Sequence, residues 1–136
     1  MAANISPIFP NVPVRGWGLL TTQTDPTMTG VGTVLTLLTA GANGTRLDSI
    51  VYEALGTNVA SVLYLYLNNG SAPTTAANNS LIKQIPLPAT TANAAYETVD
   101  VRQLMDIAMA PGDVLLASLG TAVAAGWQIT ALGGNY

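Results

Sequence analysis

Residues 39–70 constrain the fold more than any other part of the chain. They hold two runs of β-forming residues, 45–55 and 59–67, separated by the turn sequence Gly-Thr-Asn. The first run mixes polar and apolar residues on both faces, which predicts a strand that is buried in part and lies near an edge or interface. The second run is apolar on both faces, as expected of a central strand covered on both sides. We expect the two runs to form a hairpin that starts a sheet.

The rest of the chain repeats this pattern of short strand-like runs between Gly, Pro and Asn turns. Residues 102–110 are an exception, because Leu104, Ile107 and Ala108 stand at helical spacing and predict one or two helical turns, with an irregular crossover as the alternative. About eight short strands without a long helix predict an all-β fold, an antiparallel β-sandwich or jelly-roll-like single domain. The further expected strands are 14–22, 33–39, 81–87, 96–101, 114–119 and 122–132.

Residues 1–13 form an expected extended N-terminal arm, and residues 14–136 form the expected β-sandwich domain. Three prolines in the arm, at positions 7, 10 and 13, hold the backbone extended and remove hydrogen-bond donors. The arm is nevertheless too apolar for a solvated tail, so it is expected either to fold back on its own domain or to lie on a neighbouring subunit. The residues expected to make these contacts are Ile5, Ile8, Phe9 and Val12.

Two further positions are candidates for subunit or partner contacts. If only one face of the 59–67 strand meets the core, Tyr64 and Tyr66 are left for a subunit contact, since tyrosine tolerates a half-wet environment. Arg46 follows a turn and is the first basic residue we would test for an ion pair across a subunit interface.

The low charge of the chain favours association. Charged residues make up only 8% of the sequence, against about a quarter in an average soluble domain. Such a surface is plausibly covered by copies of the chain or by a partner, and the alternative is the neutral, Thr-rich surface of an ordinary monomer. The net charge of −3, with four basic residues, disfavours nucleic-acid binding. No apolar run approaches the roughly 18 residues that a membrane span needs, so no membrane partner is expected.

The sequence offers few groups for catalysis. Histidine and cysteine are both absent, which removes Ser-His and Cys-His catalysis and the commonest transition-metal ligands. Carboxylates remain, but most stand beside turns, where aspartate bonds backbone amides. We therefore expect no enzyme activity, no cofactor and no resident metal. The carboxylate pairs weighed as acid/base or calcium sites are Asp48 with Glu53, Glu97 with Asp100, and Asp106 with Asp113.

The two tryptophans have two interpretations. Trp17 and Trp127 could form a sugar-stacking platform, which would make the chain a carbohydrate-binding or receptor-binding module. The favoured interpretation is that both fill the core of a sandwich that has few other large aromatic residues.

Three passages carry a resemblance to a known family: residues 39–50, with Ala-Gly-Ala-Asn-Gly at its start, residues 54–62, and residues 119–136, with Gly-Trp-Gln-Ile-Thr. They resemble small structural proteins of tailed bacteriophages, and the whole is similar to a capsid decoration (cement) protein. The similarity covers about residues 14–136 and leaves out the arm.

The resemblance implies a non-enzymatic β-rich protein, made in the host cytoplasm, that binds the outer surface of the phage capsid. It implies a trimer that bridges neighbouring copies of the major capsid protein and so stabilises the shell. The runner-up is a phage tail-fibre or receptor-binding module that recognises host glycans, and a glycan hydrolase acting through carboxylates is a third alternative. Deleting residues 1–13 is expected to abolish capsid binding or trimer formation while leaving the fold intact.

Overall fold

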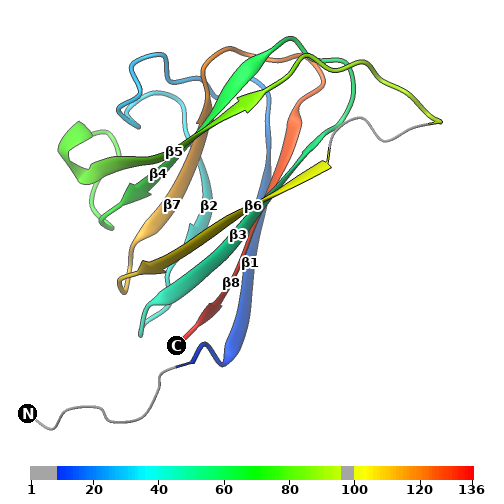
Figure 1. Ribbon diagram of the computed structural model, residues 1–136. Helices are drawn as coiled ribbons and strands as arrows, with labels where there is room; N and C mark the ends of the chain where they lie inside the picture. Colours follow the sequence, from blue (N-terminus) through cyan, green and yellow to red (C-terminus); the bar gives the residue numbers. More distant parts are fainter. Residues whose placement is uncertain (1–8, 96–99) are drawn as a thin grey trace, which may run out of the picture.

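The computed structural model describes residues 9–95 and 100–136, which form two stacked antiparallel sheets of four strands each (Figure 1). Sheet A has the strand order β1-β8-β3-β6, and sheet B has the order β2-β7-β4-β5. The strands are β1 (Val12–Leu20), β2 (Leu35–Thr39), β3 (Thr45–Ala54), β4 (Ser61–Asn68), β5 (Asn79–Leu87), β6 (Asp100–Met109), β7 (Val114–Leu119) and β8 (Trp127–Asn135). The expected all-β antiparallel sandwich is therefore confirmed.

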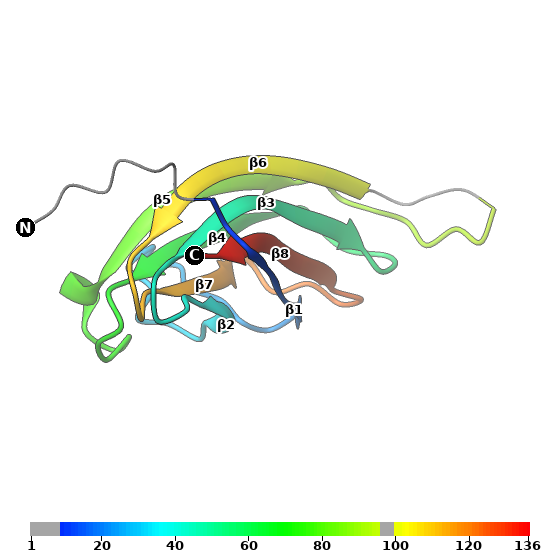
Figure 2. The ribbon, with the colours of Figure 1, turned by 90° about the horizontal axis from the view of Figure 1, so that it is seen from below.

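The strand pairs are nested in the sequence. β1 pairs with β8, β2 with β7, β3 with β6, and β4 with β5. This is the order of a jelly roll, in which one long hairpin is wound over on itself to give two layers. Figure 2 shows the consequence: the chain ends beside the start of β1, and the backbone N–H of Asn11 donates to the carbonyl oxygen of Asn135.

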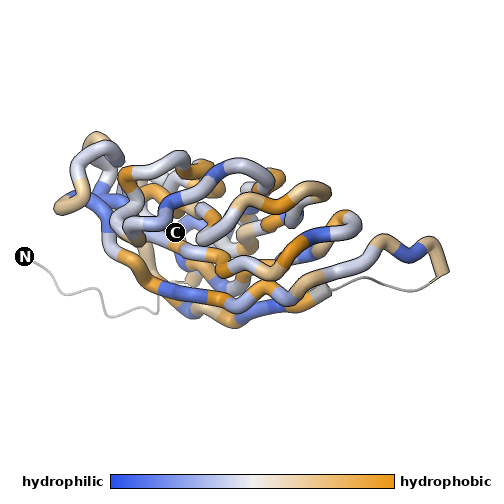
Figure 3. The backbone as a smooth tube through the Cα atoms, turned by 90° about the horizontal axis from the view of Figure 1, so that it is seen from above, coloured by the Kyte–Doolittle hydropathy of each residue, from blue (hydrophilic) through white to orange (hydrophobic). Residues whose placement is uncertain are grey.

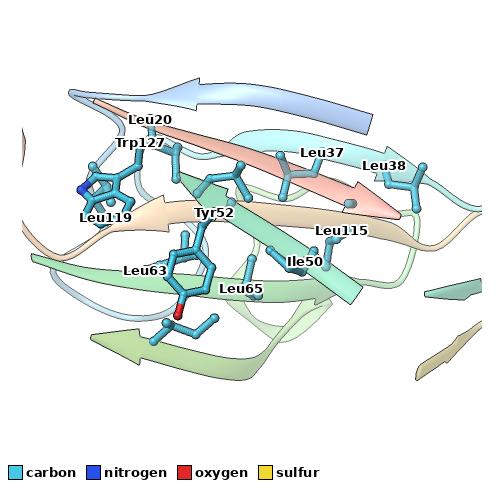
Figure 4. Close-up of a cluster of buried hydrophobic side chains, with 14 of the residues drawn as sticks. Leu20, Leu37, Leu38, Ile50, Tyr52, Leu63, Leu65, Leu115, Leu119 and Trp127 are labelled. Carbon is cyan, nitrogen blue, oxygen red and sulfur yellow. The ribbon is translucent and has the colours of Figure 1, made fainter. Parts of the chain in front are cut away.

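The core lies between the two sheets. Hydrophobic and hydrophilic positions are interleaved along the strands of both layers, as expected of sheets that turn one face inward (Figure 3). Trp127 is fully buried at one end of the core, where its ring lies beside that of Tyr52 (Figure 4). Leucines from both sheets fill most of the remaining space, among them Leu20, Leu37, Leu47, Leu63, Leu65 and Leu115.

The prediction that residues 45–67 form a hairpin is wrong, because β3 and β4 lie in different sheets. The turn between them carries the chain from one layer to the other and is held by the buried side chain of Asn58. Its Nδ2 donates to the carbonyl oxygen of Gly126, and its Oδ1 accepts from the backbone N–H of the same residue. β3 lies next to the edge strand β6 and is buried in part, as predicted.

The expected helical turns in residues 102–110 are wrong as well, because these residues belong to β6. The register of β6 against β3 shifts between Leu104 and Ile107, where one extra residue in β6 forms a β-bulge and Asp106 has a φ of 50°. A bulge interrupts the two-residue alternation of a strand. Apolar residues on opposite sides of this bulge therefore imitate the spacing of three and four that is typical of a helix.

The edges of the sheets agree with the positions of proline and glycine. Pro86 lies in the edge strand β5, as its missing N–H predicts. Gly16 marks a close backbone approach, because a Cβ atom there would lie 1.7 Å from the carbonyl oxygen of Leu37 in β2. Because Gly16 has no side chain, the two sheets can come close together along the β1–β2 side. Among the described residues, no helix has the length and apolar character to cross a membrane.

Candidate interaction surface

The outer faces of the two sheets differ, because the chain covers one of them itself. Residues 21–34, which we call the cover segment, lie over the outer face of sheet B. Thr24 forms a parallel bridge with Leu119 at the end of β7, and the side chain of Asn79 donates to the carbonyl oxygen of Thr29. Beneath the segment, Tyr66 and Leu116 are buried in a second apolar cluster.

The cover segment is fastened by a fully buried carboxylate, Asp25. One carboxylate oxygen accepts from the Tyr66 hydroxyl at 2.7 Å and from the backbone N–H of Gly30 at 2.6 Å, and the other accepts from the Thr27 hydroxyl at 2.6 Å. Burial by itself raises the pKa of Asp25, but these hydrogen bonds favour the ionised form more strongly and hold the pKa below 3.8. Burial and the bond to Asp25 both raise the pKa of Tyr66, so its hydroxyl stays a donor.

Tyr64 and Tyr66 are therefore covered by their own chain. Leu63 and Leu65 of the same strand belong to the main core, so β4 is buried on both faces, as predicted for a central strand. The condition under which the tyrosines were left for a subunit contact, one buried face only, is not met. In this structure Tyr66 is fully buried and Tyr64 almost so.

The outer face of sheet A has no such cover among the described residues. Its residues stand in cross-strand rows fixed by the register. One row runs Trp17, Thr130, Val51 and Arg102 from β1 through β8 and β3 to β6. The next runs Arg15, Leu132, Ser49 and Leu104. Trp17 is 63% exposed and Leu104 71% exposed, so large apolar side chains stand at both edges of this face. An exposed pair of this size is typical of an interaction surface.

Sheet A also carries most of the positive charge of the chain. Of the four basic residues, Arg15, Arg46 and Arg102 lie in its strands, and only Lys83 lies in sheet B. The three arginines come from three separate parts of the sequence, and the antiparallel register brings them to one sheet.

Arg46 forms ion pairs within its own chain. Its Nε lies 3.3 Å from Asp48, and its Nη2 contacts Asp106 across the β3–β6 pair. Both carboxylates stand at the β-bulge, which brings them to the same guanidinium group. Arg46 thus has two intramolecular partners, and its ion pair across a subunit interface stays a prediction.

The root of the arm lies beside this cluster. Phe9 is 75% exposed and Val12 is 55% exposed. Phe9 and Pro10 line an open hollow together with Arg46 and Asp48. Two other residues expected in the contact set, Ile5 and Ile8, lie outside the described residues. Phe9 thus lies beside Arg46 and Asp48 of β3, whereas Val12, two residues before Val14, falls on the core-facing side of β1.

The two tryptophans take different places, which corrects the favoured interpretation that both fill the core. Trp127 is fully buried, while Trp17 points away from the core on the outer face of sheet A. The reason lies in the alternation of β1, in which Val14 and Leu20 pack on the core side and Trp17 falls on the other. A platform made of both tryptophans is therefore excluded, whereas Trp17 alone is accessible.

The remaining carboxylates stand mainly at turns and ion pairs. Asp113 accepts from the backbone N–H of Ala110 in the β6–β7 turn, as predicted for an aspartate beside a turn. Asp48 and Asp106, which were weighed as members of carboxylate pairs, share Arg46 instead. Glu97 lies outside the described residues. Within residues 9–95 and 100–136, no group of three potential metal ligands is found. Only the loop-forming pair Asp25-Pro26 marks this position in the sequence, and it does not predict a buried carboxylate.

The sequence matches no family model and no curated protein. Among solved structures, the chain is similar to a chain in the crystal structure of the T13 IBDV viral particle. The two are 12% identical, the TM-score is 0.30, and the alignment covers 96% of this chain and 35% of the viral one. The chain thus spans about a third of the length of that neighbour.

Proposed function

We propose that the protein is a non-enzymatic structural protein of a virion. In this proposal it binds the outer surface of a phage capsid as a trimer and stabilises the shell by bridging copies of the major capsid protein. The observation that carries the proposal is the uncovered outer face of sheet A, with Trp17 at one edge, Leu104 at the other and the root of the arm beside it. The sequence resemblance to decoration proteins supports the same role.

The mechanism is thermodynamic linkage. A protein that binds the assembled shell but not its dissociated subunits stabilises the shell by RT ln(1 + [L]/Kd) for each occupied site. A site occupied at a hundred times its Kd adds about 2.7 kcal/mol. Sheet A offers a rigid docking face, and an arm that reaches a neighbouring subunit would turn docking into bridging. The absence of histidine and cysteine from the chain supports a role without chemistry.

Co-sedimentation with purified phage heads tests this function. The wild-type chain is expected to pellet with expanded heads that lack it, and to raise the temperature at which they release DNA. Trp17→Ala and Leu104→Asp are expected to weaken binding by a factor of ten or more, because a few large side chains carry most of the binding energy of an interface. Val59→Ala is the matched control, since Val59 is also 58% exposed but lies outside sheet A.

Two results would contradict the proposal. The first is a wild-type chain that does not pellet with any form of the head. The second is equal binding by wild type and both sheet A variants. Light scattering of the isolated chain tests the trimer separately, because a chain that stays monomeric both alone and on heads contradicts that part only.

A glycan-binding module is the second candidate, and the exposure of Trp17 specifically favours it. Sugar rings stack on an accessible indole, and jelly rolls include both viral capsid and lectin domains, although a shared fold does not imply a shared function. Titration with host polysaccharide should then change the emission of Trp17. Trp17→Phe retains only the buried Trp127 and should abolish the change, whereas Trp127→Phe should preserve it.

A further inference from the structure

A hollow on the outer face of sheet A lies between two arginines from opposite edges of the sheet. It has a volume of about 450 Å³, and its lining includes Arg15 of β1, Arg102 of β6 and Leu132 of β8. The strand register explains why these two arginines line the same hollow. Arg15 pairs with Leu132, and Leu132 pairs with Ser49 in the same row. Arg102 stands in the neighbouring row, opposite Val51, and its Nε donates to the Ser49 hydroxyl at 3.0 Å.

The two arginines keep binding capacity that Arg46 has lost. Arg46 is paired with two carboxylates, whereas no ion pair of Arg15 or Arg102 is found among the described residues. The bond from Arg102 to Ser49 uses only Nε, which leaves the Nη groups of the planar guanidinium for another acceptor. Two guanidinium groups on either side of an open hollow match a carboxylate, which accepts hydrogen bonds on both of its oxygens.

We propose that this hollow binds an acidic peptide segment, with a carboxylate held between Arg15 and Arg102 and apolar neighbours of that segment on Leu132 and Trp17. The chemistry of the lining carries this choice, because a pair of arginines beside exposed apolar side chains complements an acidic segment with apolar residues. The assignment of that segment to a shell subunit rests on the proposed function. The binding of an acidic peptide does not rest on it.

Asp48 sets the selectivity of the hollow. Its carboxylate also lines the hollow, and its ion pair with Arg46 offsets only part of its charge. With two arginines and one aspartate, the lining suits one or two carboxylates better than a dense row of phosphates. Removing the charge of Asp48 should therefore strengthen the binding of an acidic peptide.

The test is an NMR titration of the full-length ¹⁵N-labelled chain with a hexaglutamate peptide at low ionic strength. We expect the side-chain Nε–H signals of Arg15 and Arg102 and the indole signal of Trp17 to shift together, and the effect to fade at high salt. The double variant Arg15→Gln with Arg102→Gln should lower the affinity roughly tenfold, because each charge-assisted pair on an exposed face contributes a several-fold effect. Asp48→Asn should raise the affinity about threefold.

Lys83→Gln is the matched control, because it removes the one basic residue of sheet B and should leave the affinity unchanged. The proposal fails if the double variant binds as well as wild type, or if Lys83→Gln weakens binding equally. It also fails if a thymidine hexanucleotide binds more tightly than hexaglutamate, since the hollow would then be a phosphate site.

Phage heads separate this inference from the proposed function. If heads bind the double variant but not the Trp17→Ala variant, the docking face remains supported. The assignment of the acidic segment to a shell subunit is then overturned. Heads that bind no form of the chain would overturn the proposed function, while the peptide titration would still decide the hollow.

Discussion

Asp25 is the residue on which the asymmetry between the two outer faces depends. It is buried, and its bond to Tyr66 joins the cover segment to sheet B, so the segment cannot leave the sheet without breaking a charge-assisted hydrogen bond. Thr27 and Gly30 of the segment itself donate to the same carboxylate. Those bonds keep the pKa of Asp25 below its ordinary value. A carboxyl with a depressed folded-state pKa contributes stability that is fully present above the unfolded pKa, and this contribution is lost as the pH falls through the folded pKa.

Asp25→Asn is therefore expected to lower the free energy of unfolding by about 2 kcal/mol at pH 7, a typical cost for hydrogen bonds to a charged group. Below pH 3.8, the ordinary value, the wild-type carboxyl begins to lose its advantage, so the difference between the two proteins should shrink. Urea denaturation at pH 7 and at pH 3 measures both quantities. A difference that stays constant or grows toward pH 3 would contradict the assigned charge state.

Tyr66→Phe and Tyr64→Phe are the matched controls for that result. Tyr66→Phe removes one donor to Asp25 and should cost about 1–2 kcal/mol. Among the described residues no hydrogen bond of the Tyr64 hydroxyl is found, so Tyr64→Phe should change stability by less than about 0.5 kcal/mol. Equal costs for the two variants would show that the contact between Tyr66 and Asp25 does not fasten the segment.

At the scale of the elements, β1 joins the two sheets through a backbone contact. A Cβ atom on Gly16 would lie 1.7 Å from the backbone oxygen of Leu37, whereas a Cβ atom on Gly18 would meet only the side chain of Leu35, at 2.4 Å. Backbone atoms cannot move aside without shifting a strand, but a leucine side chain can change its rotamer.

Gly16→Ala is accordingly expected to destabilise the fold by about 2–3 kcal/mol, in the upper range for overpacked sites. Gly18→Ala should stay within about 1 kcal/mol of wild type. The cost of moving the leucine side chain is offset because alanine loses less backbone entropy on folding than glycine does. Chemical denaturation followed by the fluorescence of Trp127 measures both. A Gly18→Ala variant that is the less stable of the two would contradict the close approach of β1 to β2.

The same elements show how far the sequence predicts this fold. Strand-forming runs and turn residues placed seven of the eight strands approximately, because alternation and turn chemistry are local. The predicted strand 96–101 overlaps β6 only at residues 100–101. The partner of each strand is not local. Residues 45–67 read as a hairpin because the chain turns at Gly56, but the turn crosses between layers, and only the nested pairing decides this. The bulge in β6 was likewise hidden, since its shift exists only relative to β3.

The interaction surface was harder to predict for the same reason. Arg15 and Arg102 are far apart in the sequence. They line one hollow with Leu132 only because of the β1–β8–β3–β6 register. Trp17 was placed in the core because large aromatic residues are few, whereas the alternation of β1 turns it outward. Tyr66 was considered for a contact because no local signal shows that residues 21–34 cover sheet B.

At the scale of the whole molecule, the nested pairing brings the end of the chain beside the start of the first strand. The backbone N–H of Asn11 bonds the carbonyl oxygen of Asn135, and Val12 stands opposite Asn135, so the marked end of the chain lies beside the start of β1 (Figure 2). The β5–β6 connection, by contrast, is exposed over residues 91–95. A chain joined at one place and opened at the other would retain every strand pair.

A circular permutant tests this arrangement and separates the two parts of the proposed interface. It begins at Ala95, ends at Ala94, and joins Tyr136 to Pro10 through a short Gly-Ser linker, so that sheet A is complete but the arm before Pro10 is absent. It is expected to unfold cooperatively, with a stability within about 2 kcal/mol of wild type, because exposed loops tolerate new ends. A second permutant opened between Thr130 and Ala131 splits β8, the strand between β1 and β3, and should not fold.

Because sheet A is intact, the first permutant should bind hexaglutamate as wild type does. If the arm of the wild-type chain bridges to a neighbour, the first permutant should dock on phage heads without raising their thermal stability. Full stabilisation by this permutant would show that sheet A acts alone.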